Sequence, residues 1–258
     1  MNDDKNDSIA KSLETHKGML QYMPKLLEDL WDMGCSLQTI LKLVEPLNLP
    51  IDETKILDLG CGKGAAGLTL ADKFGFSLVG VDASEDFLNS AISKASEMGL
   101  TDRSNFILQD IRESVKKESY YDLVIYASLG NILGNFDQIV QSLRNVIKTG
   151  GYIIIDDGYL KNNESVDRAG YGHYRSYNST IQLLLSHGDK LISEMSTDEE
   201  TLGINNEYLR LIKIRAKEII EKNPDAETMI AEYIRGQEEE CKFIDENVSG
   251  AAWLLQKA

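Results

Sequence analysis

The sequence predicts an α/β fold with a doubly wound, mostly parallel sheet of seven strands. Short segments that are apolar almost throughout recur along the chain, and most of them precede a helical segment. Strands of this composition are buried on both faces, and strands that alternate with helices form parallel sheets covered by helices. Right-handed crossovers make such a sheet doubly wound. We expect a single domain over residues 1–258, which is enough chain for one large domain.

Residues 8–48 are predicted to form helices in front of the sheet. In the first of these helices, apolar residues recur at spacings of three and four: Leu20, Met23, Leu26, Leu27, Leu30 and Trp31. Gly34 is expected to end this helix, and a second, short helix is expected from Ser36 toward Val44.

The first five strands are expected to alternate with helices. We place these strands at residues 55–59, 77–82, 105–110, 122–127 and 152–156. Ser84 in front of two acidic residues is typical of an N-cap and predicts a helix over 85–98. An amphipathic pattern predicts another helix over 135–148.

The last third of the chain is predicted to hold three helices and two further strands. The helices are expected at 177–187, at 205–222 and from Pro224 onward, and the strands at 190–196 and around 252–255. The α/β core would then comprise residues 53–196 and 249–258. Residues 197–248 would form a helical insertion, or cap, before the last strand.

The charge balance argues against nucleic acid and anionic membranes as partners. The chain carries 42 Asp and Glu against 27 Lys and Arg, whereas phosphate backbones are held by clustered Lys and Arg. No apolar run approaches the ~20 residues of a membrane helix, and the first residues lack the basic start and apolar stretch of a signal peptide. Three cysteines without a CxxC spacing favour a reducing compartment over disulfides or a zinc site. We expect a cytoplasmic protein with no metal.

A glycine-rich turn, Gly60-Cys-Gly-Lys-Gly64, follows the first predicted strand. Backbone amides at the start of a helix bind anions, and glycines let a ligand approach the chain closely. Gly62, Gly64 and Gly67 also satisfy the dinucleotide pattern, with Asp82 at the distance in sequence where an acidic residue holds a ribose. An isolated glycine triplet is equally well explained as an ordinary strand–helix turn.

Three aspartates make the turn more informative. Asp58 lies on the first strand, while Asp82 and Asp110 end the second and third. The carboxyl ends of parallel strands share one edge of the sheet, which is where ligands bind in such folds. Without basic partners nearby in the sequence, three carboxylates suit a cationic ligand with hydroxyl groups better than a pyrophosphate.

From about residue 53 to residue 157, the sequence resembles the Rossmann-like, class I S-adenosylmethionine-dependent methyltransferases. Four motifs carry the resemblance, and their combination in this order is specific: Ile56-Leu-Asp-Leu-Gly-Cys-Gly-Lys-Gly64, Val79-Gly-Val-Asp82, Gln109-Asp-Ile111 and Ala127-Ser-Leu129. The resemblance implies the fold described above, S-adenosylmethionine as cofactor, and methyl transfer as activity.

The resemblance also implies which residues bind the cofactor. The glycine loop would pack against its methionine part, Asp82 would hold the ribose hydroxyls, and Asp110 would accept a hydrogen bond from the adenine amino group. In this family, segments before the first strand commonly close over the cofactor, so residues 1–50 are expected to form a lid. The full predicted set is Asp58, Gly60, Cys61, Gly62, Gly64, Asp82, Ala83, Phe87, Gln109, Asp110, Ile111, Ala127 and Tyr22.

Candidate acceptor residues follow the fifth strand. Asp157, the first catalytic candidate, is expected to point into the crevice, although paired acids at a strand end are also often solvated. The loop expected at 158–175 is rich in tyrosine, and we select Tyr159 and His173 from this region as catalytic candidates, with His173 able to take a proton. Tyrosines that only attach a long loop to the domain are the simpler interpretation. A general base is needed only if the acceptor must lose a proton.

A small molecule is the expected acceptor. Strand four ends in Ala127-Ser-Leu-Gly130 rather than Asn/Asp-Pro-Pro-Tyr, which argues against methylation of DNA bases or glutamine side chains. The insertion over 197–248 would shape an acceptor pocket or a homodimer interface. Two other functions stay open: a non-catalytic protein that binds S-adenosylmethionine, and an NAD(P)-dependent oxidoreductase.

Overall fold

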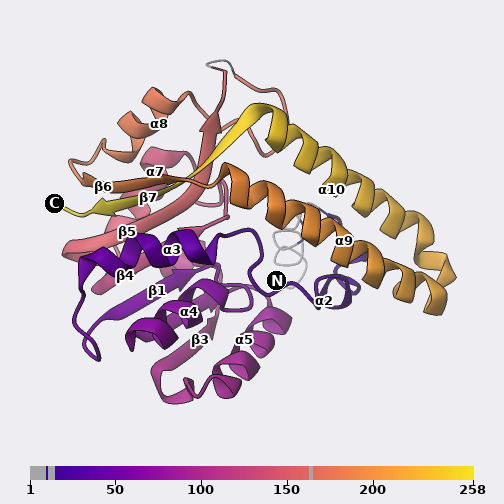
Figure 1. Cartoon of the computed structure of the whole chain (residues 1–258), viewed down its shortest axis with the longest axis horizontal. Helices are drawn as coiled ribbons and strands as arrows, with labels where there is room; N and C mark the ends of the chain where they lie inside the picture. Colours follow the sequence, from indigo (N-terminus) through magenta and orange to yellow (C-terminus); the bar gives the residue numbers. More distant parts are fainter. Residues whose placement is uncertain (1–9, 11–14, 163–164) are drawn as a thin grey trace.

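A seven-stranded sheet forms the centre of the computed structural model, which describes residue 10 and residues 15–162 and 165–258, without the side chains of 198–202 (Figure 1). Its order is β3-β2-β1-β4-β5-β7-β6, and only β7 runs antiparallel to its neighbours. The strands are β1 (Lys55–Leu59), β2 (Ser77–Asp82), β3 (Ser104–Leu108), β4 (Tyr121–Ala127), β5 (Ile147–Leu160), β6 (Lys190–Ser196) and β7 (Val248–Gln256). The predicted seven-stranded, mostly parallel fold is confirmed.

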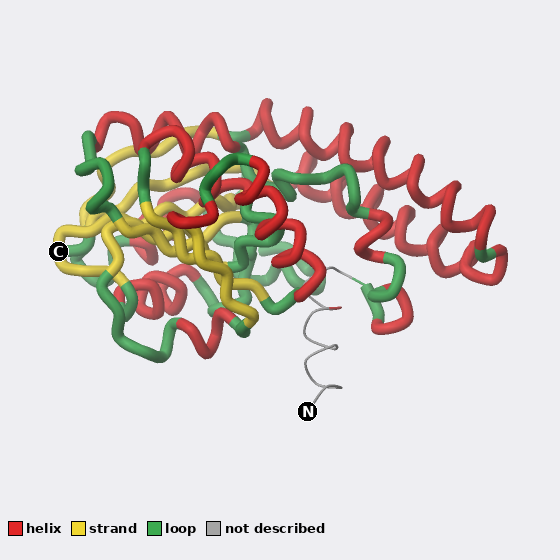
Figure 2. The backbone as a smooth tube through the Cα atoms, turned by 90° about the horizontal axis from the view of Figure 1, so that it is seen from below, coloured by secondary structure: helices red, strands yellow, loops and turns green. Residues whose placement is uncertain are grey.

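Helices cover both faces of this sheet, and a further pair is inserted between β6 and β7. The α-helices are α2 (Met23–Leu26), α3 (Leu37–Val44), α4 (Ala65–Phe74), α5 (Glu85–Glu97), α6 (Ile111–Ser114), α7 (Phe136–Arg144), α8 (Tyr177–Leu184), α9 (Asp198–Lys222) and α10 (Glu227–Asn247). The inserted pair, α9 and α10, lies side by side and projects beyond the sheet (Figures 1 and 2).

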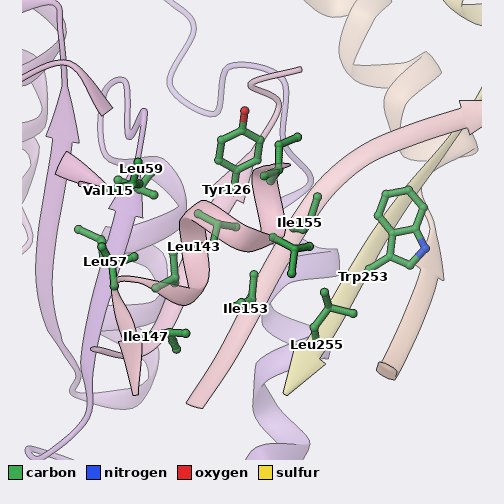
Figure 3. Close-up of a cluster of buried hydrophobic side chains, with 14 of the residues drawn as sticks. Leu57, Leu59, Val115, Tyr126, Leu143, Ile147, Ile153, Ile155, Trp253 and Leu255 are labelled. Atoms are coloured by element: carbon green, nitrogen blue, oxygen red, sulfur yellow. The ribbon is translucent and has the colours of Figure 1, made fainter. Parts of the chain in front are cut away.

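Alternation along the strands divides the apolar residues between two cores. Leu57, Ile153, Ile155 and Trp253 point toward α7 and α8 and belong to the cluster in Figure 3. The residues between them point toward α3, α4 and α5: Ile56, Ile154, Ala252 and Leu254. Near-continuous apolar strands are therefore required, because both faces are covered.

A third core lies outside the sheet. It joins the N-terminal segment to Phe87 of α5 and to the inner faces of α9 and α10. Its N-terminal members are Met19, Met23, Leu26, Leu27 and Leu30. This cluster accounts for the apolar spacing that predicted a long N-terminal helix.

That long helix is not formed in the described part of residues 8–34. The segment instead has a 3-10 turn at Lys17–Met19 and the four-residue α2, followed by turns. Pro24 has no N–H for a helical bond to Leu20 and its ring clashes with the preceding turn, so a continuous helix is excluded there. The second predicted helix is confirmed as α3, where Ser36 accepts a hydrogen bond from the Thr39 N–H.

The fifth strand is longer than predicted. We expected it to end at Asp156, but β5 continues to Leu160 because β7 pairs with it from Asp156 to Leu160. β4, on its other side, ends where Ala127 pairs with Asp156. Asp157 is thus the first residue of β5 beyond the end of β4. Among the described residues, no helix has the length and apolar composition that a membrane crossing requires.

Candidate functional site

A cavity of about 1660 Å³ opens at the carboxyl ends of β1, β2, β4 and β5, beneath the N-terminal segment, α9 and α10. The strand order reverses between β1 and β4, which is the position where doubly wound sheets bind ligands. Pockets for one small molecule usually measure roughly 300–1,000 Å³. The cavity therefore has room for two small molecules together.

Eight of the predicted cofactor residues line this cavity, and five do not. Those in the lining are Gly60, Gly62, Asp82, Ala83, Phe87, Asp110, Ile111 and Ala127. Those outside it are Asp58, Cys61, Gly64, Gln109 and Tyr22.

The glycine loop has a backbone that other residues would not adopt without strain. Gly60 and Gly62 have φ angles of +63° and +52°, in the left-handed region. A Cβ on Gly60 would lie 2.3 Å from Cδ2 of Leu129, and one on Gly62 would lie 2.8 Å from Cε of Met33. Other residues would therefore be strained at both positions, and glycine leaves bare backbone facing the cavity.

Asp82 connects the glycine loop to the end of β2. Its Oδ2 accepts from the Gly62 N–H at 2.9 Å, and its Oδ1 accepts from the Ser84 N–H at 2.8 Å. These bonds hold the carboxylate at the cavity wall in a defined orientation. Ser84 caps α5 as predicted.

Asp110 has a basic partner, contrary to the expectation of unpaired carboxylates. Arg112 donates from Nε to both carboxylate oxygens at 3.0 Å, and the Arg112 N–H donates to Oδ1 as the first turn of α6 is capped. The Arg112 side chain holds the pKa of Asp110 below its usual value. The two residues are only two positions apart, so the pairing was available in the sequence.

Asp58 is buried between β1 and α4 instead of facing the cavity. It is 3% exposed, and its Oδ2 accepts from the Gly67 N–H at 3.0 Å. Strand alternation turns it away from Leu57 and Leu59, toward α4. Burial raises its pKa to about 7, against the lowering effect of the Gly67 hydrogen bond.

The other four residues outside the lining also make contacts within the protein instead of facing the cavity. Cys61 is buried, and Gly64 with a φ of +82° caps α4. The Gln109 side chain accepts from the Ser114 hydroxyl at 3.1 Å. Tyr22 packs against the third core.

Two of the three catalytic candidates meet at the cavity wall. Asp157 and His173 both line it, and their side chains are 4% and 5% exposed. Nε2 of His173 lies 3.9 Å from Oδ2 of Asp157, while its Nδ1 lies 3.0 Å from the Gly170 carbonyl. Tyr174, which sequence reasoning missed, donates its hydroxyl to Oδ1 of Asp157 at 2.6 Å.

Tyr159, the third candidate, lies in β5 and away from the cavity lining. Its ring packs edge-on against Tyr177 at 5.1 Å and lies 6.5 Å from Trp253. Farther along the loop, Tyr171 packs on Phe243 of α10 at 4.9 Å and donates to Glu240. Some of the tyrosines therefore do attach this region to the rest of the protein.

Hydrogen bonds that the sequence did not predict hold the N-terminal segment over the cavity. Tyr208 of α9 accepts from the Gly34 N–H at 2.9 Å and donates to the Asp32 carbonyl. The Ser128 hydroxyl, at the end of β4, donates to the Gly34 carbonyl at 2.6 Å. One stretch of chain is thus bound to both the sheet and the cap.

Lys63 of the glycine loop adds a second attachment. Lys63 is buried, with 7% of the residue exposed, and its ammonium donates to the carbonyls of Leu27 and Glu28. Trp31 returns a bond from its indole N–H to the Lys63 carbonyl at 3.3 Å. Interactions between residues more than thirty positions apart leave no local signal in a sequence.

Comparison of the sequence with known protein families identifies the class of domain to which this fold and site belong. A family model described as a methyltransferase domain matches residues 51–223. The chain belongs to this family, within the class I S-adenosylmethionine-dependent methyltransferases.

Curated relatives match over part of their length. A sterol 4-C-methyltransferase of Caenorhabditis elegans is 28% identical over 152 residues, which cover 59% of this chain and 42% of that protein. A ubiquinone biosynthesis O-methyltransferase of Rickettsia akari is 31% identical over 114 residues, 44% of either protein. The match thus spans less than half the length of these relatives.

Solved structures match over nearly the whole chain. An S-adenosylmethionine-dependent methyltransferase from Geobacter sulfurreducens, in complex with S-adenosylhomocysteine, has a TM-score of 0.78 at 18% identity and covers 92% of this chain and 98% of its own. YjhP of Escherichia coli has a TM-score of 0.76 at 18% identity, with coverages of 93% and 100%. At this identity, the likeness shows the fold.

Proposed function

We propose that the protein transfers the methyl group of S-adenosylmethionine to a small-molecule acceptor bound beneath the cap. The observation that carries the proposal is a single cavity at the switch point of a methyltransferase-family chain, large enough for cofactor and acceptor, with the glycine loop and Asp82 in its wall. When bound, S-adenosylmethionine supplies a methyl group already activated by its sulfonium.

The residues in the cavity wall fit this cofactor. The bare backbone at Gly60 and Gly62 lets the amino-acid part lie against the chain. The Asp82 carboxylate suits the ribose hydroxyls, because a carboxylate oxygen accepts more than one hydrogen bond. Phe87 and Ile111 offer apolar surface to the adenine.

Four other predicted residues have supporting roles in this proposal. Ala83 and Ala127 leave space beside the ligand, and Asp110, oriented by Arg112, accepts from the adenine amino group. Asp58 supports the site indirectly, because its hydrogen bond from the Gly67 N–H holds α4 in position. A contact from Tyr22 to the cofactor remains a prediction.

The cap and the N-terminal segment exclude water from the transfer. Alignment of donor and acceptor in a closed site supplies several kcal/mol of the barrier reduction. Because α9 and α10 contribute to the cavity wall, they are proposed as the wall of the acceptor pocket. The acidic composition supports a small acceptor rather than a nucleic acid. A cytoplasmic location and a homodimer remain predictions.

Calorimetric titration with S-adenosylhomocysteine tests the cofactor site. Asp82→Ala should weaken binding by about tenfold to a hundredfold, because hydrogen bonds to a charged group contribute roughly 1.5–3 kcal/mol. Asp86→Ala removes the same charge from an exposed position on α5 and should leave the affinity unchanged. Equal affinities in the two variants would contradict the site.

A further inference from the structure

Two buried polar atoms face one another at the cavity wall and have no hydrogen-bond partner in the part of the chain that the structure describes. They are Oδ2 of Asp157 and Nε2 of His173. Their separation of 3.9 Å is too long for a direct hydrogen bond. Buried polar atoms are nearly always paired in folded proteins, so this pair calls for a group from outside the chain.

The protons around the pair indicate what that group must be. A carbonyl only accepts, so the contact with Gly170 requires a proton on Nδ1 of His173, and Nε2 is an acceptor whenever the ring carries only that proton. Tyr174 donates to the other oxygen of Asp157. Burial and the Asp157 charge raise the pKa of Tyr174, so its hydroxyl keeps the proton. Two acceptors facing each other require a hydrogen-bond donor between them.

The pair lies close to the end of β4. Asp157 follows the last residue of β5 that pairs with β4, and a Cβ on Gly130 would lie 4.0 Å from Cε1 of His173. β4 is also the neighbour of β1, whose end carries the glycine loop. Asp157 and His173 line the same cavity as the loop residues Gly60 and Gly62.

We infer that Asp157 and His173 bind and deprotonate the acceptor, and that the acceptor carries its nucleophile as an O–H or N–H group. This inference rests on the proposed methyl transfer. As the acceptor heteroatom bonds to the methyl carbon, the carbon–sulfur bond breaks and its electron pair stays on sulfur. The acceptor proton moves to Nε2 of His173, and the Asp157 carboxylate stabilises the imidazolium. Tyr174 is a positioning residue that holds this carboxylate.

Nitrogen-15 NMR of the histidine rings tests the inference without knowledge of the natural acceptor. Phenol and aniline are probes with an O–H and an N–H, and anisole has a similar ring without a donor. In protein saturated with S-adenosylhomocysteine, phenol or aniline should shift the Nε2 resonance of His173, assigned with His173→Gln, whereas anisole should not. The resting ring should be the Nδ1–H tautomer. About tenfold weaker probe binding is expected in Asp157→Ala.

His187 provides the matched control. Its Nε2 already lies 3.2 Å from Oδ1 of Asp137, at a partly exposed site outside the cavity lining, so its resonance should not move. The inference is overturned if His173 is the Nε2–H tautomer, if neither protic probe shifts it, or if anisole shifts it equally. Titrations repeated without S-adenosylhomocysteine separate this result from a failure of cofactor binding, which calorimetry reports independently.

Discussion

Three aspartates at one edge of the sheet have different roles because their surroundings differ. Asp82 holds the glycine loop through two backbone N–H groups, Asp110 is paired with Arg112, and Asp58 is buried against α4. Asp82 and Asp110 are within reach of a ligand in the cavity. Asp58, whose pKa is raised to about 7 by burial, is instead expected to make the stability of the protein depend on pH.

Asp58→Asn should change how stability depends on pH. Because the folded-state pKa of Asp58 is raised to about 7, the folded protein holds this proton more tightly than the unfolded chain. The contribution of Asp58 to stability therefore falls as pH rises from about 4 to about 7, by about 1.4 kcal/mol per pH unit, and is constant above. Asparagine keeps an acceptor for the Gly67 N–H and has no charge.

Urea unfolding at about pH 5 and about pH 8 measures this effect. Between these pH values, the variant should gain roughly 3 kcal/mol relative to the wild-type protein. Asp72→Asn, on the exposed side of α4, serves as the control and should show no such gain. If the stability of the wild type and that of Asp58→Asn change by the same amount between the two pH values, the proposed burial of this charge is refuted.

At the level of elements, the N-terminal segment and the cap form one structural unit. The segment has little regular helix, yet its apolar residues complete the third core with α9 and α10. Lys63 and Tyr208 bind it from the glycine loop and from α9, respectively. A few polar contacts therefore help to hold the N-terminal segment over the cavity, and the effect of removing each contact can be measured.

Lys63→Met should loosen the N-terminal segment without disturbing the sheet. Methionine keeps the apolar stem and removes the ammonium, so the carbonyls of Leu27 and Glu28 lose their donor at a cost of about 1–3 kcal/mol. Amide hydrogen exchange should become faster over residues 27–34 and remain unchanged in β1 and β4. Lys73→Met, at an exposed position of α4, is the matched control. Unchanged exchange over 27–34 would show that this attachment is dispensable.

At the scale of the whole molecule, the cavity separates an α/β body from a helical cover. Its wall takes residues from the glycine loop, from the ends of β4 and β5, and from α9 and α10. A ligand that fills it makes contacts with both parts. Binding should therefore be visible in the stability of the entire chain.

S-adenosylhomocysteine should raise the melting temperature, and NAD should not. A ligand that binds only the folded state at about 100 times its Kd adds about 2.7 kcal/mol, which for a chain of this size corresponds to a shift of roughly 5–10 °C. Thermal unfolding with each compound at matched concentration provides the comparison. A shift with NAD alone would overturn the methyltransferase proposal in favour of an oxidoreductase.

The sheet, the strand–helix alternation and the glycine loop were predictable from residue patterns. Strands such as β1 and β2 are apolar runs bounded by turn residues, and the requirement for glycine at Gly60 and Gly62 is local to the loop. The prediction of a long N-terminal helix was wrong, because apolar residues at spacings of three and four show only that these residues are buried on the same side of the segment. That side proved to belong to the third core.

Sequence pattern alone predicted the alternation of strands and helices, the edge where a ligand is expected and the family, because each depends on residues close together in the chain. Long-range packing decided the rest. It turned Asp58 toward α4, placed Tyr159 against Trp253, and brought Asp157 to His173 and Tyr174. The direction of a side chain depends on neighbours contributed by distant segments, and those neighbours are defined only once the chain has folded.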